Sequence, residues 1–224
     1  MRGSTLITLF IDSSSKVLSV AITSGDKLVF ESCITSYSNH SNYLMNEIDR
    51  ALKTIKMSIN DINNIVVLNG PGSFTGIRVG VTVAKTLAWA LKKEIYVLSN
   101  LKAIKIGIEN EVVISVIYDK DDYSYVGIYD DDKETEEYLG VDSGLFKFKN
   151  KKITICALDN NNYVKKLTNL LSLDNTVDFK LIKKYDYISL VKYALSCESV
   201  NPHLVNPVYL KKIDAEKNNV NKKI

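Results

Sequence analysis

Histidine and cysteine are scarce in this chain, which limits the metal and catalytic sites that its 224 residues can build. The two histidines, His40 and His203, lie far apart and neither belongs to an H-x-x-x-H pair. The three cysteines, Cys33, Cys156 and Cys197, form no C-x-x-C pair. The sequence therefore indicates neither a zinc site nor a disulfide framework, and it supplies a Ser-His-Asp triad poorly.

Long apolar runs and an excess of one charge are missing as well. No stretch reaches the roughly 18 apolar residues of a membrane span, and the N-terminus lacks the basic-then-apolar layout of a secretory signal. We therefore expect a cytoplasmic protein without a membrane partner. The net charge of +3, from 29 basic and 26 acidic residues, is too balanced to predict nucleic-acid binding, so we expect RNA contacts to be local or indirect.

A glycine-rich turn stands out at Asn69–Arg78, directly after the apolar run Ile65–Leu68. Gly70 and Gly72 can adopt positive φ, and Ser73 is a residue type that caps helices. The pattern predicts strand, turn and helix. Free amides in such a turn can bind phosphate, but the spacing matches neither nucleotide fingerprint. A purely structural turn remains the alternative.

The N-terminal part reads as three antiparallel strands, Leu6–Ile11, Val17–Ile22 and Leu28–Thr35. Asp12 ends the first strand and is followed by Ser13 and Ser14. A carboxylate beside hydroxyls is suited to a hydrated metal ion or to nucleotide phosphates. A solvated turn explains the same residues.

Two helices are predicted around the glycine-rich turn. The first runs from about Asn42 to Lys56 and has one apolar stripe. The second runs from about Phe74 to Lys92, and its apolar arc of about 220° exceeds what one sheet requires. Within this arc a row of small residues could admit a partner helix, and burial by the same chain is the alternative. The row consists of Gly76, Gly80, Ala84 and Ala88.

The second half alternates strands with helices, which places the chain in the α/β class. The patterns predict strands at Ile95–Leu98, Val112–Tyr118, Tyr123–Tyr129, Ile153–Leu158 and Asp178–Ile182, and helices at Ser99–Ile108, Asn160–Leu171 and Tyr187–Cys197. The acidic stretch Asp119–Asp122 is expected to be a solvated hairpin tip. We expect an N-terminal lobe at 1–100, a C-terminal lobe with the closing segment at 101–213, and a flexible tail at 214–224.

These residues resemble the TsaB family, also called YeaZ, over residues 5 to about 105. The resemblance lies in Ile11–Ser14, Leu18–Ala21, His40–Ser41, Asn69–Gly80 and Ala84–Lys85, and Asn206–Leu210 is similar to the family's closing segment. It implies an actin-like, Hsp70-like (ASKHA) two-lobed fold with a reduced second lobe.

The resemblance also implies a function. Family members act with TsaD, TsaE and TsaC to place threonylcarbamoyl on adenosine 37 of tRNAs that read ANN codons. TsaB is the non-catalytic member and forms a dimer with TsaD, or with itself when alone. The chain agrees with this role because its last glycine is Gly144, so residues 145–224 lack the glycine turns by which backbone approaches a nucleotide. Asn42 stands where the family often has an acidic residue, which puts one polar contact at the dimer edge in doubt.

The sequence thus predicts a partner surface and no catalytic or metal-binding residues. The expected partner contacts are Gly76, Gly80, Val83, Ala84, Leu87, Leu44 and Ile48. A vestigial nucleotide site would comprise Asp12, Ser13, Ser14, Gly70 and Gly72. We expect no intrinsic cofactor, and ATP or ADP with magnesium at the TsaD interface is left open. The alternative function is an ATP-dependent kinase or hydrolase of the same fold, based on Asp12 beside the glycine-rich turn.

Overall fold

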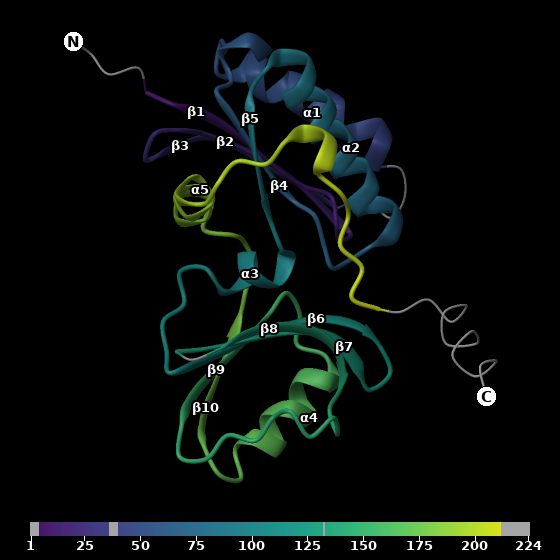
Figure 1. Ribbon diagram of the computed structural model, residues 1–224, viewed down its shortest axis with the longest axis vertical. Helices are drawn as coiled ribbons and strands as arrows, with labels where there is room; N and C mark the ends of the chain where they lie inside the picture. The colour runs from purple at the N-terminus through teal and green to yellow at the C-terminus, as the bar shows by residue number, and fades with distance from the viewer. Residues whose placement is uncertain (1–4, 36–39, 132, 212–224) are drawn as a thin grey trace, which may run out of the picture. The chain divides into compact units, whose positions relative to one another are not determined.

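The computed structural model describes residues 5–35, 40–131 and 133–211, and these form two compact units (Figure 1). Unit 1 comprises the described residues of Met1–Ile108 together with Ile182–Pro207, and unit 2 comprises those of Glu109–Leu181 and of the segment from Val208. This division differs from the expected one, because the chain returns to unit 1 after residue 181. The tail expected at 214–224 lies outside the described residues.

Unit 1 is built on a five-stranded sheet with strand order β3-β2-β1-β4-β5. The first three strands form the predicted antiparallel meander, and the last two run parallel to β1. Every residue of β1 and β4 is buried, as expected for strands covered on both faces. The strands are β1 (Ile7–Asp12), β2 (Val17–Ser24), β3 (Lys27–Thr35), β4 (Asn64–Leu68) and β5 (Glu94–Leu98).

Helices cover both faces of this sheet. The buried faces of α1 (His40–Thr54) and α2 (Phe74–Leu91) share one core with alternate residues of β1, β2 and β4. α5 (Tyr187–Ser196) packs on the opposite face, where the ring of Phe10 lies 5.3 Å from that of Tyr187. Figure 1 shows the sheet between these layers. Three short helices, η1 (Ile59–Asp61), α3 (Asn100–Lys105) and η2 (Pro202–Leu204), complete unit 1.

Unit 2 repeats the strand plan with a second five-stranded sheet, ordered β10-β9-β6-β7-β8. Three antiparallel strands are again followed by two parallel ones. One face packs on α4 (Asn162–Leu171), which is the one helix in the described part of unit 2. The strands are β6 (Val112–Lys120), β7 (Tyr123–Asp130), β8 (Glu134–Gly140), β9 (Lys152–Ala157) and β10 (Thr176–Leu181).

Two features of unit 2 differ from the sequence-based expectations. Strand β8 was not predicted, because its Glu-rich sequence lacks an apolar alternation and it lies at a sheet edge. The expected solvated tip is only partly right, because Asp119 lies within β6 and its carboxylate pairs with Lys211 at 2.7 Å. Residues 141–151, all described, contain no helix, whereas α1 occupies the equivalent connection in unit 1. The second unit is therefore the reduced one.

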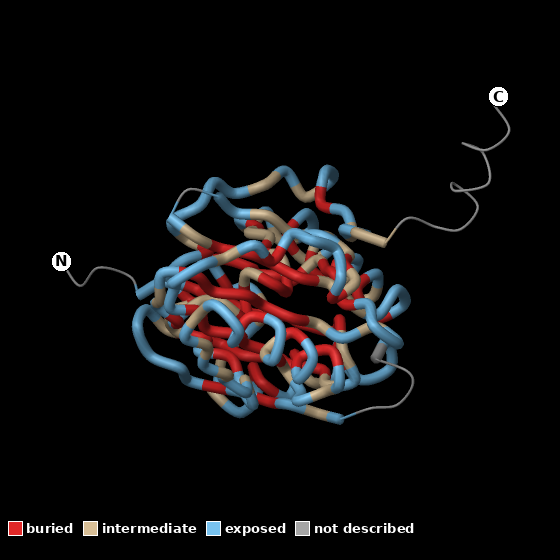
Figure 2. The backbone as a smooth tube through the Cα atoms, turned by 90° about the horizontal axis from the view of Figure 1, so that it is seen from below, coloured by how far each residue is buried: buried red, intermediate tan, exposed pale blue. Residues whose placement is uncertain are grey.

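Buried residues run along the strands of each sheet, as Figure 2 shows. The cores of the two units consist mainly of aliphatic side chains. No helix in the described ranges has the length and apolar character needed to cross a membrane.

Candidate functional site

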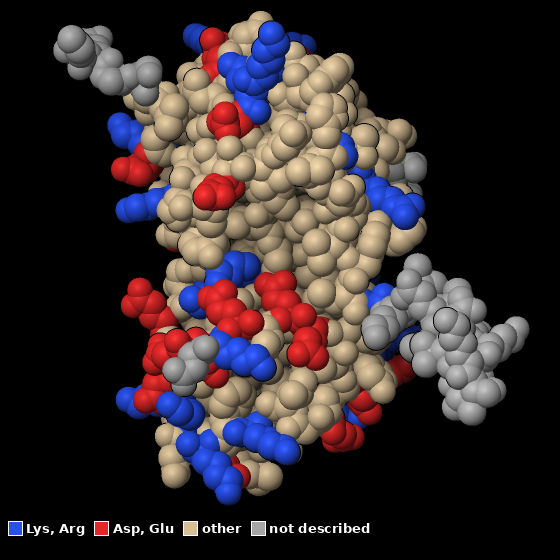
Figure 3. All heavy atoms as spheres, in the orientation of Figure 1, with Lys and Arg blue, Asp and Glu red and all other residues tan. Residues whose placement is uncertain are grey.

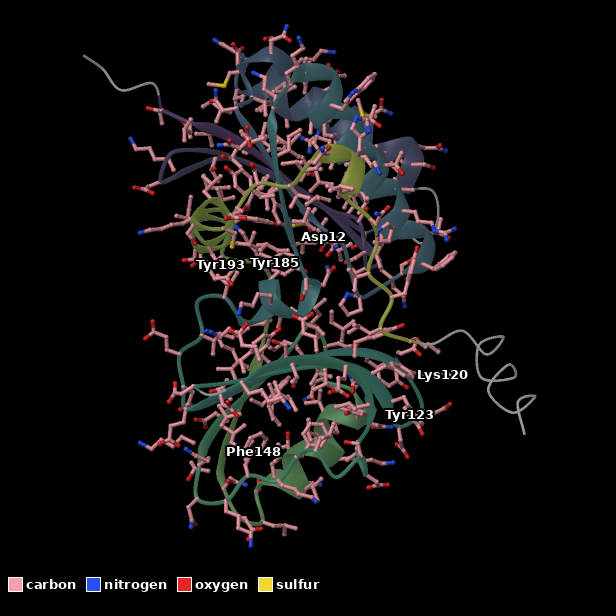
Figure 4. The ribbon with its side chains drawn as sticks, in the orientation of Figure 1. Asp12, Lys120, Tyr123, Phe148, Tyr185 and Tyr193 are labelled. Carbon is pink, nitrogen blue, oxygen red and sulfur yellow. The ribbon has the colours of Figure 1, made fainter. Side chains whose placement is uncertain are left out.

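The predicted nucleotide site centres on Asp12, which the structure buries at the end of β1 with 1% of its surface exposed. Its carboxylate accepts hydrogen bonds from the Ser14 amide at 2.9 Å, the Tyr185 hydroxyl at 3.1 Å and the Asn100 side-chain amide at 3.4 Å. Figure 4 shows Asp12 and Tyr185 close together within unit 1. The chain itself therefore satisfies and covers this carboxylate.

Burial shifts the pKa values of both Asp12 and Tyr185. Burial raises the pKa of Asp12, although the hydrogen bonds from Ser14, Tyr185 and Asn100 oppose this effect. Burial and the nearby Asp12 charge raise the pKa of Tyr185 well above its ordinary value. The Tyr185 hydroxyl consequently keeps its proton and acts as a hydrogen-bond donor.

The glycine-rich turn uses its polar backbone groups within the chain. The Gly70 backbone amide donates to Asn100 Oδ1 at 2.8 Å, and the Asn100 backbone amide donates to the Gly70 carbonyl at 2.8 Å. The Ser73 amide donates to the Ser14 carbonyl at 2.6 Å, and Ser73 Oγ accepts from the Gly76 amide at 3.3 Å. A phosphate cradle needs such amides to face a ligand, and these amides already have partners inside unit 1.

The segment of residues 12–14, at the end of β1, is here called the Asp12 corner. The glycines are needed because α2 approaches this corner very closely. A Cβ atom at Gly72 would lie 2.5 Å from the Ser14 carbonyl oxygen, and one at Gly76 would lie 2.0 Å from that of Ser13. At Gly80 it would lie 2.4 Å from Ser13 Oγ, which donates a hydrogen bond to the Gly76 carbonyl. Gly76 and Gly80 of the small-residue row thus accommodate the chain's own β1–β2 corner.

This packing bears on the residues predicted as partner contacts, which stay a prediction. Gly76, Gly80, Ala84, Leu44 and Ile48 are all buried within unit 1, so residues of the same chain cover them. Val83 and Leu87 are half-buried and pack against the same core. The alternative from the sequence, burial of the apolar arc by the same chain, accounts for most of α2.

The exposed sides of α1 and α2 carry large side chains instead. Tyr43 of α1 is 47% exposed, and Phe74 and Trp89 of α2 are 49% and 61% exposed. The Arg78 guanidinium lies 3.7 Å from the centre of the Phe74 ring, a cation–π arrangement. Thr82 lies on α2 between Phe74 and Trp89, and its side chain is exposed.

Sequence reasoning missed two members of the Asp12 network, Asn100 and Tyr185. Asn100 begins α3 directly after the capping residue Ser99, and a polar side chain at that place was a weak signal. Tyr185 lies in the connection before α5, where no local pattern distinguishes it. No group of three or more His, Cys, Asp or Glu residues in the described part of the chain could hold a metal ion.

Comparisons with known proteins agree with the sequence resemblance. A family model described as "TsaD: tRNA N6-adenosine threonylcarbamoyltransferase" matches residues 34–200. The chain is 37% identical to the tRNA threonylcarbamoyladenosine biosynthesis protein TsaB of Bacillus subtilis over 123 residues. These residues cover 54% of this chain and 54% of that protein. The chain is 31% identical over 100 residues to tRNA N6-adenosine threonylcarbamoyltransferase of Persephonella marina, 45% of this chain and 27% of that protein.

The fold is shared with YeaZ from Pseudomonas aeruginosa, with a TM-score of 0.70, 20% identity, and coverage of 92% of this chain and 100% of that chain. The predicted α/β fold with two lobes, of which the second is reduced, is confirmed. The match spans about half the length of the TsaB relative and about a quarter of the transferase relative. Because the family model covers most of the chain and TsaB relatives match about half of it at 31% to 37% identity, the chain belongs to the TsaD family and, within it, to the TsaB (YeaZ) proteins.

Proposed function

We propose that this chain is a non-catalytic subunit that binds a TsaD-type transferase in the biosynthesis of N6-threonylcarbamoyladenosine at position 37 of ANN-decoding tRNAs. Family membership supports the pathway, since relatives named TsaB and relatives named as the transferase both match the chain. The closed Asp12 corner supports the non-catalytic role and is the observation that carries the proposal.

A nucleotide does not fit the corner as it is built. Asp12 is covered by Tyr185, and the amides of Gly70, Ser73 and Gly76 have partners within unit 1. A phosphate would have to replace these bonds and move the start of α2 away from the Ser13 and Ser14 carbonyls, on which Gly72 and Gly76 pack closely. This argues against the kinase or hydrolase alternative, and we propose that any ATP or ADP with magnesium binds on the transferase side of a complex.

The exposed sides of α1 and α2 are the proposed docking surface. They present aromatic and arginine side chains, Tyr43, Phe74, Arg78 and Trp89, which are the types that contribute most at protein interfaces. We infer that TsaD binds here in a heterodimer, that the same surface pairs two copies when TsaD is absent, and that TsaE joins the larger complex. tRNA then meets the chain mainly through TsaD.

A substitution at the centre of this surface tests the docking proposal. Thr82→Arg adds a bulky charged side chain to an exposed position of α2, so it should leave the fold intact and weaken binding to the cognate TsaD at least tenfold. Calorimetric titration measures the affinity. Thr176→Arg, the same change at an exposed position of β10 in unit 2, is the matched control.

Two results would contradict the proposal. One is an affinity for TsaD that stays within twofold of wild type in a Thr82→Arg, Phe74→Ala double variant. The other is an equal loss of affinity in Thr176→Arg, which would place the interface elsewhere.

A further inference from the structure

Unit 2 carries a cluster of three tyrosine rings, which we call the tyrosine platform: Tyr123, Tyr125 and Tyr138. The rings of Tyr123 and Tyr138 are stacked, with centroids 5.5 Å apart and planes 19° apart. The ring of Tyr125 lies 5.1 Å from that of Tyr138. The three side chains come from β7 and β8 and form one continuous aromatic surface.

The strand register explains this arrangement. Tyr125 lies directly opposite Tyr138, and Tyr123 lies opposite Gly140, so all three rings emerge on the same face of the sheet. Gly140 has no side chain, and a Cβ there would already lie 3.5 Å from the Tyr123 ring. The ring of Tyr123 can therefore lie across the strand and reach Tyr138.

Hydrogen bonds hold the central ring in place. The Tyr138 hydroxyl donates to Asp119 Oδ2 at 2.8 Å, and Lys211 Nζ donates to the same oxygen at 2.7 Å. Lys211 Nζ also lies 5.2 Å from the centre of the Tyr138 ring. Burial, followed by the bond to Asp119, raises the pKa of Tyr138 to about 12, so its hydroxyl keeps the proton. The outer ring of Tyr123 is 49% exposed and is available to a ligand.

The charges near the platform suit an anionic ligand better than the acidic hairpin suggests. Asp119 pairs with Lys211, and Asp122 pairs with Lys166, so these two carboxylates are neutralised. Lys120 lies directly opposite Tyr123, and Figure 4 shows the two side by side. The charges left beside the exposed ring therefore include the cation of Lys120 together with the carboxylate of Asp121 in the hairpin turn.

Two acidic residues of β8 lie toward the other end of the strand pair, whereas Glu137 directly precedes Tyr138 and lies opposite Val126, so the alternation of the strand places it on the other face of the sheet. Glu134 lies opposite Tyr129, and Glu136 lies opposite Gly127. Figure 3 shows side chains of both signs interspersed over unit 2. Beyond Lys211 the sequence continues with four lysines and two carboxylates: Lys212, Lys217, Lys222, Lys223, Asp214 and Glu216.

We propose that the tyrosine platform stacks an unpaired base of single-stranded RNA, with Lys120 beside the adjoining phosphate. Aromatic rings on an open sheet face next to lysines are the means by which proteins bind single-stranded nucleic acid without strong sequence preference. This inference adds a direct RNA contact to the proposed function and rests on it for the identity of the ligand. With about one phosphate contact, a rise in NaCl from 50 to 200 mM should weaken binding only about threefold.

Fluorescence anisotropy with a fluorescein-labelled ten-nucleotide oligoadenylate tests the platform in the full chain. Binding should be saturable below 200 µM, and Tyr123→Ala should weaken it at least tenfold, because stacking on one ring contributes that much. Tyr123→Phe, which keeps the ring, should bind within threefold of wild type. Tyr118→Ala is the matched control, because Tyr118 is a similarly exposed tyrosine whose register places it on the opposite face of the sheet.

Three outcomes would overturn the inference. They are no saturable binding of the oligonucleotide by the wild-type chain, an equal loss in Tyr118→Ala, and tighter binding of a proline-rich decapeptide that also depends on Tyr123. The TsaD titration separates this inference from the proposed function. Tyr123→Ala should bind TsaD with wild-type affinity, so failure at the platform leaves the docking proposal intact.

Discussion

The two units share one strand plan and use its first hairpin corner in opposite ways. In unit 1 the corner after β1 holds Asp12, which is buried and hydrogen-bonded to Tyr185. In unit 2 the equivalent carboxylate is Asp119, which lies near the end of β6, is only partly buried and pairs with Lys211. The difference follows from the helices, since unit 1 has layers on both sheet faces whereas unit 2 has α4 on one.

The two units also differ in the turns that lead from a strand into α2 and into α4. Unit 1 enters α2 through a turn with Gly70, Gly72 and then Gly76, whereas unit 2 enters α4 through Leu158–Asn161 without glycine. Both helices have a side-chain cap, from Ser73 and Asn161. A helix start therefore does not need glycine, and the glycines of unit 1 reflect the close approach of α2 to the Asp12 corner.

The largest expected effect comes from adding one methyl group to a glycine of each unit. Gly76→Ala would place a Cβ 2.0 Å from the Ser13 carbonyl oxygen, whereas Gly140→Ala would make an ordinary 3.5 Å contact. We expect Gly76→Ala to lower the free energy of unfolding by about 3 kcal/mol and Gly140→Ala to change it by less than about 0.5 kcal/mol. Urea unfolding measures the free energy of unfolding of both variants. An equal loss in the two would contradict the expected difference between the units.

Smaller effects of opposite sign are expected at the two corner carboxylates. Burial raises the pKa of Asp12 in the folded protein above its pKa in the unfolded chain. Once the pH exceeds the pKa of the unfolded chain, the ionised form of Asp12 therefore opposes folding. Asp12→Asn removes the charge and keeps an acceptor for the Ser14 amide. It should therefore be more stable than wild type by about 1 kcal/mol at pH 7. The difference should shrink as the pH falls through the folded pKa toward that of the unfolded chain.

Asp119 should behave in the reverse way. Burial would raise its pKa, but hydrogen bonds from Lys211 and Tyr138 outweigh this and hold the pKa of Asp119 below its usual range. Its stabilising contribution is present above the unfolded pKa and is lost as the pH falls through the folded one. Asp119→Asn should therefore cost about 0.5 kcal/mol at pH 7. Thermal unfolding from pH 3 to 8 measures both variants, and the same sign for both would contradict this account.

Much of the fold could be predicted from the sequence because its signals are local. Alternating or continuous apolar runs predicted β1 to β3 and β4, and the stripe that contains Leu44 and Ile48 predicted the buried face of α1. The turn at Gly70 and Gly72 and the cap at Ser73 correctly placed the start of α2. These features depend on neighbours within a few residues.

The rest depends on contacts between distant residues. Asp12, Asn100 and Tyr185 meet only after the chain has folded, so no spacing rule joins them. The direction in which the small-residue row faces was open for the same reason, because a helix periodicity does not show which neighbour fills its groove. β8 was missed because edge strands tolerate charged residues that periodicity assigns to loops.

A calorimetric titration of the isolated chain with ATP and magnesium tests the closed Asp12 corner most directly. The account predicts no measurable binding up to millimolar nucleotide, because Tyr185 covers the carboxylate and the turn amides are used within unit 1. Micromolar binding that disappears in Asp12→Ala would contradict it and would restore the nucleotide-dependent enzyme as the function of this chain.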